Sequence, residues 1–130
     1  MDLTFTPEAQ KRVERYLRPN TKLLLDFDDG VGPFSNLGNC SMDSHYKLIF
    51  VKDDLELPDF DQSFPSNLGP VYYKGYNAPQ YEAGMQLQFN KRYFTLPLVS
   101  PSSVLTDDVE LVDAYDFQPQ ATQQSVSHDC

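Results

Sequence analysis

The chain of 130 residues lacks tryptophan, has only two cysteines and two histidines, and contains no long apolar run. Without a stretch of about 18 to 20 apolar residues, the sequence predicts no membrane-spanning helix. The opening segment MDLTFTPEAQ has neither a basic start nor an apolar core, so we expect no secretion signal and a cytoplasmic location. In a reducing compartment, Cys40 and Cys130 are expected to remain free thiols.

Basic residues are also scarce, because 10 Lys and Arg face 19 Asp and Glu, for a net charge of −9. The charge is uneven: residues 1–22 carry five basic and three acidic side chains (+2), and residues 23–130 carry five and sixteen (−11). Such a surface repels phosphate backbones, so we expect no nucleic-acid partner. Cations and basic proteins are the compatible ligand classes, although acidic residues can also serve solubility alone.

The overall composition is that of a folded protein, with 40% hydrophobic and 22% charged residues. The length suits one hydrophobic core, to which nine Phe and eight Tyr contribute much of the volume. We expect residues 1–114 to form a single domain. Residues 115–130 are rich in Gln and Ser and are expected to form a mobile polar tail.

One helix is expected near the N-terminus. Thr6 is suited to cap it, and Pro7 suits the first helical position, where a missing N–H costs nothing. Pro19 stops the pattern, so the helix is expected over residues 7–17. Its apolar residues share one face and its basic residues lie on the others: Ala9, Val13 and Leu17 against Lys11, Arg12 and Arg15.

Alternating apolar residues predict strands over residues 22–28 and 45–53, the first of them buried on one face. Shorter strands are expected in 71–75, 85–90, 92–99 and 109–114, and residues 55–70 are expected to be irregular. Pro97 places its strand at an edge or indicates a bulge. The pattern predicts a mainly β fold bordering on α+β: a small β-sandwich or folded sheet of about six or seven short strands with the helix packed on it.

The segment DFDDGVGPFSNLGNC, from Asp26 to Cys40, is the main candidate for a binding site. It does not fit a calcium EF-hand, because glycine and valine stand where a ligand and the required glycine belong. It does not fit a phosphate loop either, because Gly32 is followed by proline rather than by Lys and Ser or Thr. A Cys40–His45 nucleophile pair would require the loop to fold back, and His45 is more simply a strand-edge histidine.

Cys40 is a candidate metal ligand, because thiolate is a soft ligand suited to iron, zinc or clusters. Iron–sulfur clusters take about four cysteines, which one copy of this chain does not have. Any cluster would therefore need a symmetric dimer, with Cys40 supplied twice and Cys130 as a further candidate.

Three segments, LTFTPEAQKRVERYL, KLLLDFDDGVGPFS and GNCSMDSHYKLIFV, carry a family resemblance. Together they resemble the HesB/IscA-like iron–sulfur cluster biosynthesis family, the A-type carrier core domain, and most closely its divergent Gram-positive branch found in lactobacilli. The resemblance runs from Met1 to Ala114. It implies a small, mostly β fold with a packed helix, a carrier or iron-donor role without catalytic turnover, and oligomers that share ligands between chains.

The chain departs from the family at the later Cys-Gly-Cys motif, because VSPSSVLTDD stands there instead, with Ser102 and Ser103 in place of thiolates. The resemblance therefore implies Cys40 as the cofactor-binding residue for iron or an iron–sulfur cluster. The acids Asp26, Asp28 and Asp29 are candidates for additional oxygen ligands of the metal. It also implies a homodimer and iron–sulfur assembly proteins as partners. The alternative is a protein-interaction module that keeps this scaffold without metal and binds partners through the basic face of helix 7–17 and the acidic remainder of its surface.

Overall fold

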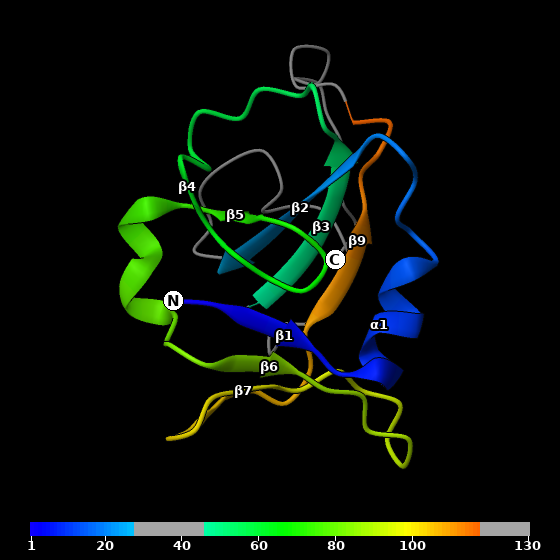
Figure 1. Ribbon diagram of the computed structural model, residues 1–130, viewed down its shortest axis with the longest axis vertical. Helices are drawn as coiled ribbons and strands as arrows, with labels where there is room; N and C mark the ends of the chain where they lie inside the picture. The colour runs from blue at the N-terminus through cyan, green and yellow to red at the C-terminus, as the bar shows by residue number, and fades with distance from the viewer. Residues whose placement is uncertain (28–45, 118–130) are drawn as a thin grey trace, which may run out of the picture.

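The computed structural model describes residues 1–27 and 46–117, and its fold is mainly β (Figure 1). The described residues form nine strands in two sheets, one α-helix and one 3-10 helix. The predicted fold class, with a single helix near the N-terminus, is confirmed. In chain order the elements are β1 Leu3–Phe5, α1 Pro7–Glu14, β2 Thr21–Phe27, β3 Tyr46–Lys52, β4 Gln62–Phe64, β5 Val71–Tyr73, η1 Gly75–Gln80, β6 Met85–Leu87, β7 Leu98–Val99, β8 Val104–Thr106 and β9 Glu110–Asp113.

The first sheet has the strand order β1-β6-β7-β8, with β1 parallel to β6 and the other neighbours antiparallel. The outer edge of β1 is closed by residues 65–67 rather than by a full strand: the Leu3 N–H donates to the Pro65 carbonyl at 3.1 Å, and the Asn67 side chain binds Phe5. Asn67 accepts a hydrogen bond from the Phe5 N–H (2.8 Å) and donates one to the Phe5 carbonyl (3.1 Å). This amide thus replaces a missing strand neighbour and satisfies backbone groups that would otherwise be exposed at an edge.

The second sheet has the order β4-β5-β2-β3-β9. Strands β2 and β3 are antiparallel over their full length, from the pair Thr21 and Lys52 to the pair Phe27 and Tyr46. Strand β5 lies parallel to β2 and β9 lies parallel to β3, whereas β4 is antiparallel to β5. The prediction that β2 is buried on one face only is wrong, because residues 23–26 are all buried.

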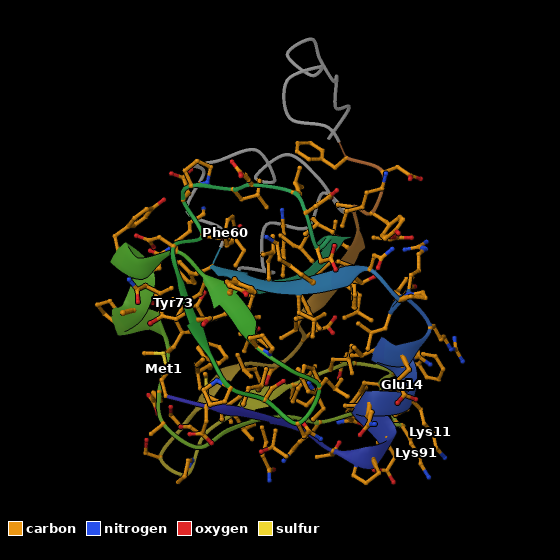
Figure 2. All side chains as sticks on the ribbon, turned by 45° about the horizontal axis from the view of Figure 1, so that its top comes forward. Met1, Lys11, Glu14, Phe60, Tyr73 and Lys91 are labelled. Carbon is orange, nitrogen blue, oxygen red and sulfur yellow. The ribbon has the colours of Figure 1, made fainter. Side chains whose placement is uncertain are left out.

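Two separate cores explain this double burial. The main core fills the space between the two sheets, which face one another in Figure 2. A smaller core covers the outer face of the second sheet, where Leu24, Ile49 and Val51 meet Phe60 and Val112. The smaller core is closed by residues from segments that follow β3 and β9, among them Leu55, Leu57 and Phe117. Sequence alternation alone could not reveal this cover, because it comes from irregular segments.

Helix α1 closes the main core with its buried residues Ala9 and Val13. As predicted, the Thr6 hydroxyl caps its start, accepting from the Ala9 N–H at 3.4 Å. The helix ends at Glu14, three residues earlier than predicted, although Leu17 still packs against the main core.

The predicted strand over residues 92–99 is mostly wrong, because only Leu98–Val99 pair as β7. The preceding residues form a turn closed by Asn90, whose N–H donates to the Thr95 carbonyl at 2.8 Å. The register of β7 shifts between Leu98 and Val99, in agreement with the bulge expected at Pro97. Within the residues described, no helix has the length and apolar character needed to cross a membrane.

Candidate functional site

The ends of β2 and β3 form the base of the segment that contains Cys40. The last pair of the two strands is Phe27 and Tyr46, so residues 28–45 leave and re-enter the sheet at this point. Cys40, Asp28, Asp29 and His45 lie outside the described residues, as does Cys130. Their proposed roles therefore stay predictions, and the described site is the set of residues around this base.

Asp26 is the one predicted ligand that the structure describes. It is 1% exposed, and its Oδ1 lies 3.1 Å from Nζ of Lys74, which is equally buried. The sheet register also places Asp26 opposite Lys47 of β3, and Lys47 beside Glu110 of β9. Because directly paired residues share a face, acidic and basic side chains alternate across this end of the sheet.

This arrangement gives Asp26 a structural role that the sequence did not reveal. A buried carboxylate needs a compensating charge, and the Lys74 ammonium supplies it. A metal ion bound at Oδ1 of Asp26 would compete with that ammonium. The signal available in the sequence was Lys47, a lysine that shares a strand face with Ile49 and Val51 and therefore had to be buried with an acidic partner.

The segment from η1 to Tyr81 is bound to the ends of β2 and β3. The Asn77 side chain donates to the Phe27 carbonyl at 3.4 Å, and the Tyr46 hydroxyl donates to the Gln80 carbonyl at 2.9 Å. The Tyr81 hydroxyl donates to the Leu25 carbonyl at 2.9 Å. Burial, the largest cause, and the nearby Asp26 charge raise the pKa of Tyr81, so its phenol remains a hydrogen-bond donor.

Immediately after this segment, Glu82 accepts hydrogen bonds from three serines. Ser102 donates to Oε1 at 3.0 Å, Ser103 donates to Oε2 at 3.3 Å, and Ser100 also donates to Oε1. These hydroxyl bonds, that of Ser100 foremost, lower the pKa of the Glu82 carboxyl. We refer to Glu82, Ser100, Ser102 and Ser103 as the Glu82–serine cluster.

The antiparallel pairing of β6 with β7 assembles this cluster, because Gln86 lies opposite Val99. Gly84 lies just before β6 and permits the close approach of Pro101, which follows β7. It has a φ of +72°, and a Cβ at this position would lie 3.3 Å from Cδ of Pro101. Both the positive φ and the contact disfavour any larger residue. The serines stand out in the sequence, but Glu82 does not, because it lies 20 positions from Ser102 and no local pattern marks it.

Tyr46 connects the cluster with the base of the Cys40 segment. Its hydroxyl is bound to Gln80, two positions before Glu82, and its pKa is raised by burial and by the Glu82 charge. Ser102 and Ser103 are thus linked through Glu82 and the neighbouring Gln80 to Tyr46, the first residue of β3. The cluster offers hydroxyl and carboxylate oxygens, which do not fit an iron–sulfur cluster because its irons take thiolates.

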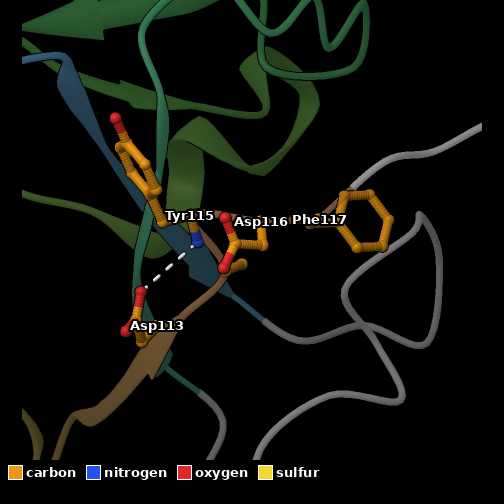
Figure 3. A pocket seen from close by; sticks show the side chains of 5 residues that line it. Asp113, Tyr115, Asp116 and Phe117 are labelled. Atoms are coloured by element: carbon orange, nitrogen blue, oxygen red, sulfur yellow. Dashed lines mark hydrogen bonds between the residues drawn. The ribbon is translucent and has the colours of Figure 1, made fainter.

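Neither the acidic side chains nor the pocket after β9 forms a further site in the described part of the chain. Among residues 1–27 and 46–117, no group of three His, Cys, Asp or Glu is arranged to hold a metal ion. A pocket after β9 is lined only by the consecutive residues 113–117 (Figure 3), where the Tyr115 N–H donates to Oδ1 of Asp113 at 3.3 Å. Since no other element contributes to it, this pocket has no convergent chemistry.

The described residues define a small two-sheet β domain with an N-terminal helix. The family of iron–sulphur cluster biosynthesis proteins matches residues 1–113, and the chain belongs to this family. No curated protein matches the chain.

Two solved structures are similar to the chain. A candidate Fe-S biosynthesis protein from Lactobacillus salivarius, described as having a novel fold, is 34% identical over 87% of this chain and 98% of its own, with a TM-score of 0.78. A second such protein, from Lactobacillus acidophilus, is 21% identical over 85% of this chain and 88% of its own, with a TM-score of 0.67. The second likeness concerns the fold alone.

Proposed function

We propose that the protein acts in iron–sulfur cluster assembly or iron handling in the cytoplasm, with the Cys40 thiolate as the ligand for iron or a cluster carried as cargo. The observation that supports this proposal is the position of Tyr46 and the Glu82–serine cluster. They link Ser102 and Ser103, which we propose stand in place of the family's cysteine pair, to Tyr46 at the base of the Cys40 segment. The proposal includes no catalytic turnover.

A single thiolate per chain requires a second copy. With Cys40 from each of two chains, a homodimer would supply two sulfur ligands, and Cys130 or the carboxylates of Asp28 and Asp29 would complete the coordination. Asp26 is the weakest of the proposed ligands, because its carboxylate already neutralises Lys74. Iron–sulfur assembly proteins are the proposed partners in delivery.

The test is anaerobic reconstitution of the full chain with ferrous iron and sulfide. We expect sulfur-to-iron charge-transfer absorption and bound iron in the wild type, both lost in Cys40→Ser. The control is Ser63→Ala, an exposed substitution on β4, which should leave both unchanged. Sedimentation in the presence of iron should show a dimer. A colourless wild type without bound iron, or a metal-loaded monomer, would overturn the proposal.

A second candidate function is a protein-interaction module that has kept the scaffold and lost metal binding. The observation in its favour is the Glu82–serine cluster itself, where hydroxyls bound to a carboxylate stand in the region of the missing thiolates. The same reconstitution separates the two candidates, because the module predicts no iron uptake by either the wild type or Cys40→Ser.

A further inference from the structure

One corner of this acidic protein carries an unusual concentration of positive charge. Helix α1, its C-cap residue Arg15 and the turn of residues 90–95 together contain five Lys or Arg and two Glu, whereas the whole chain has a net charge of −9. Figure 2 shows Lys11 of the helix and Lys91 of the turn at the same corner of the molecule. We define the basic–aromatic corner by these residues: Lys11, Arg12, Arg15, Lys91, Arg92, Tyr93 and Phe94.

Arg12 joins the helix to the turn. Its guanidinium carbon lies 4.8 Å from the ring centroid of Phe89 and 4.4 Å from that of Phe94. The two rings are themselves in edge contact, with centroids 5.3 Å apart. The guanidinium is thus held between aromatic rings, a geometry that leaves its N–H donors available.

None of these cations has an anionic partner among the described residues, which is also true of the isolated lysines Lys22 and Lys52. Elsewhere Arg18 pairs with Asp113, and Lys74 pairs with Asp26. Within residues 1–27 and 46–117, the five basic residues of the corner form no ion pair, and Arg12 has no hydrogen-bond acceptor. Since they lie close together on one surface, they would gain from an added anionic group.

The turn presents aromatic rings to solvent at a cost to the backbone. Tyr93 is 68% exposed and Phe94 is 66% exposed. Phe94 also has a φ of 60°, which is rare for a bulky residue and costs roughly 1–3 kcal/mol. Asn90 holds the turn in this form. Its side-chain Oδ1 accepts hydrogen bonds from the backbone N–H groups of Arg92 (2.9 Å) and Tyr93 (3.2 Å). Its backbone carbonyl accepts one from the N–H of Phe94 (2.7 Å).

We propose that the basic–aromatic corner is a docking surface for an acidic segment of a partner protein, one in which carboxylates alternate with apolar side chains. The unpaired cations would bind the carboxylates, and the exposed rings of Tyr93 and Phe94 would bind the apolar groups. A short acidic peptide touches only this corner. A long polyanion such as RNA would also meet the acidic remainder of the surface and be repelled.

This docking surface does not depend on metal binding by Cys40, so it is tested separately. The probe is a short fluorescein-labelled peptide of alternating Glu and Leu, titrated with the full chain and followed by fluorescence anisotropy. We expect saturable binding that weakens as salt rises above about 0.15 M, because exposed charges are screened. A peptide with Gln in place of Glu should bind at least about tenfold more weakly.

Two variants test the surface itself. Arg92→Glu should weaken binding of the peptide about tenfold. Phe94→Gly should weaken it by a similar factor without lowering the melting temperature, because glycine adopts a φ of 60° without strain. The matched controls are Lys52→Glu on the second sheet and Tyr76→Ala, an equally exposed aromatic on η1; both should bind like the wild type.

Several results would overturn the proposal. These are no binding of the Glu–Leu peptide, equal binding of the Gln peptide, or unchanged binding in both corner variants. Tighter binding of a single-stranded oligonucleotide to the corner would make it a nucleic-acid surface instead. Concentration-dependent self-association that Arg92→Glu abolishes would assign the corner to a second copy of the chain.

Discussion

Asp26 and Lys74 form an ion pair of 3.1 Å inside the smaller core, with both side chains 1% exposed. A lone buried charge is costly, so removing either partner should destabilise the domain by about 3–5 kcal/mol. Lys74→Met and Asp26→Asn test this in urea denaturation. The double variant should lose less stability than the sum of the two single losses, because the residues are coupled. Additive losses would show that the pair contributes no interaction of its own.

The Glu82–serine cluster predicts a pH dependence of stability. The three hydroxyls favour the ionised carboxylate and lower its pKa in the folded state below the ordinary 4.5. A lowered folded-state pKa contributes stability that is present above the unfolded value and lost as the pH falls through the folded value. The wild type should therefore melt at a higher temperature than Glu82→Gln near neutral pH.

That difference in melting temperature should shrink as the pH falls below about 4.5. Removing two of the hydroxyl donors should also weaken the stabilisation of the carboxylate. The double variant Ser102→Ala/Ser103→Ala should therefore melt at a lower temperature than the wild type near neutral pH. Thr4→Ala, an exposed change on β1, serves as the control and should leave the pH profile unchanged. A constant difference between wild type and Glu82→Gln at every pH would contradict this account of the cluster.

We expect residues 115–117 to contribute to the stability of the domain and residues 118–130 to be dispensable for it. Tyr115 lies between two cations, with its ring centroid 4.5 Å from the Arg18 guanidinium carbon and 5.5 Å from Nζ of Lys52. Phe117 packs against the smaller core. Removing residues 115–130 should therefore lower the stability by about 1–2 kcal/mol through lost apolar burial.

Removal of residues 118–130 alone should leave the melting temperature unchanged, consistent with the polar tail expected from the composition. Differential scanning calorimetry on the two truncated chains measures both effects. The expectation fails if the shorter truncation lowers the melting temperature as much as the longer one does.

Asn67 should stabilise the domain although its own side chain is exposed. Its amide satisfies both backbone groups of Phe5, whose surroundings are buried. Asn67→Ala should cost about 1–3 kcal/mol in urea denaturation, because unsatisfied buried backbone groups are expensive. Gln62→Ala, an exposed change on β4, should cost much less. A loss of stability no larger than that control would mean that water replaces the amide at the edge of β1.

Hydrophobic alternation and local caps were sufficient to predict the longer elements. Strands β2 and β3 each contain seven residues, enough for a period of two to stand out, and Thr6 with Pro7 marked the start of α1. Strands β1, β4 and β8 have three residues each and were missed, whereas β5 and β6, equally short, were predicted inside longer apolar segments. The missed strands form because neighbouring strands supply their hydrogen bonds, and the Asn67 amide adds to those of β1.

The candidate site, like the fold, could be predicted from the sequence only in part. The amino-acid sequence by itself determined that Cys40 is the one internal thiol and that positive charge gathers near the N-terminus, and it predicted that serines stand in place of the family's cysteine pair. Only the tertiary structure decided which charges meet: Lys74 with Asp26, 48 positions away, and Glu82 with Ser102. The physical reason is that such pairs depend on strand register and on burial between sheets, which no local pattern encodes.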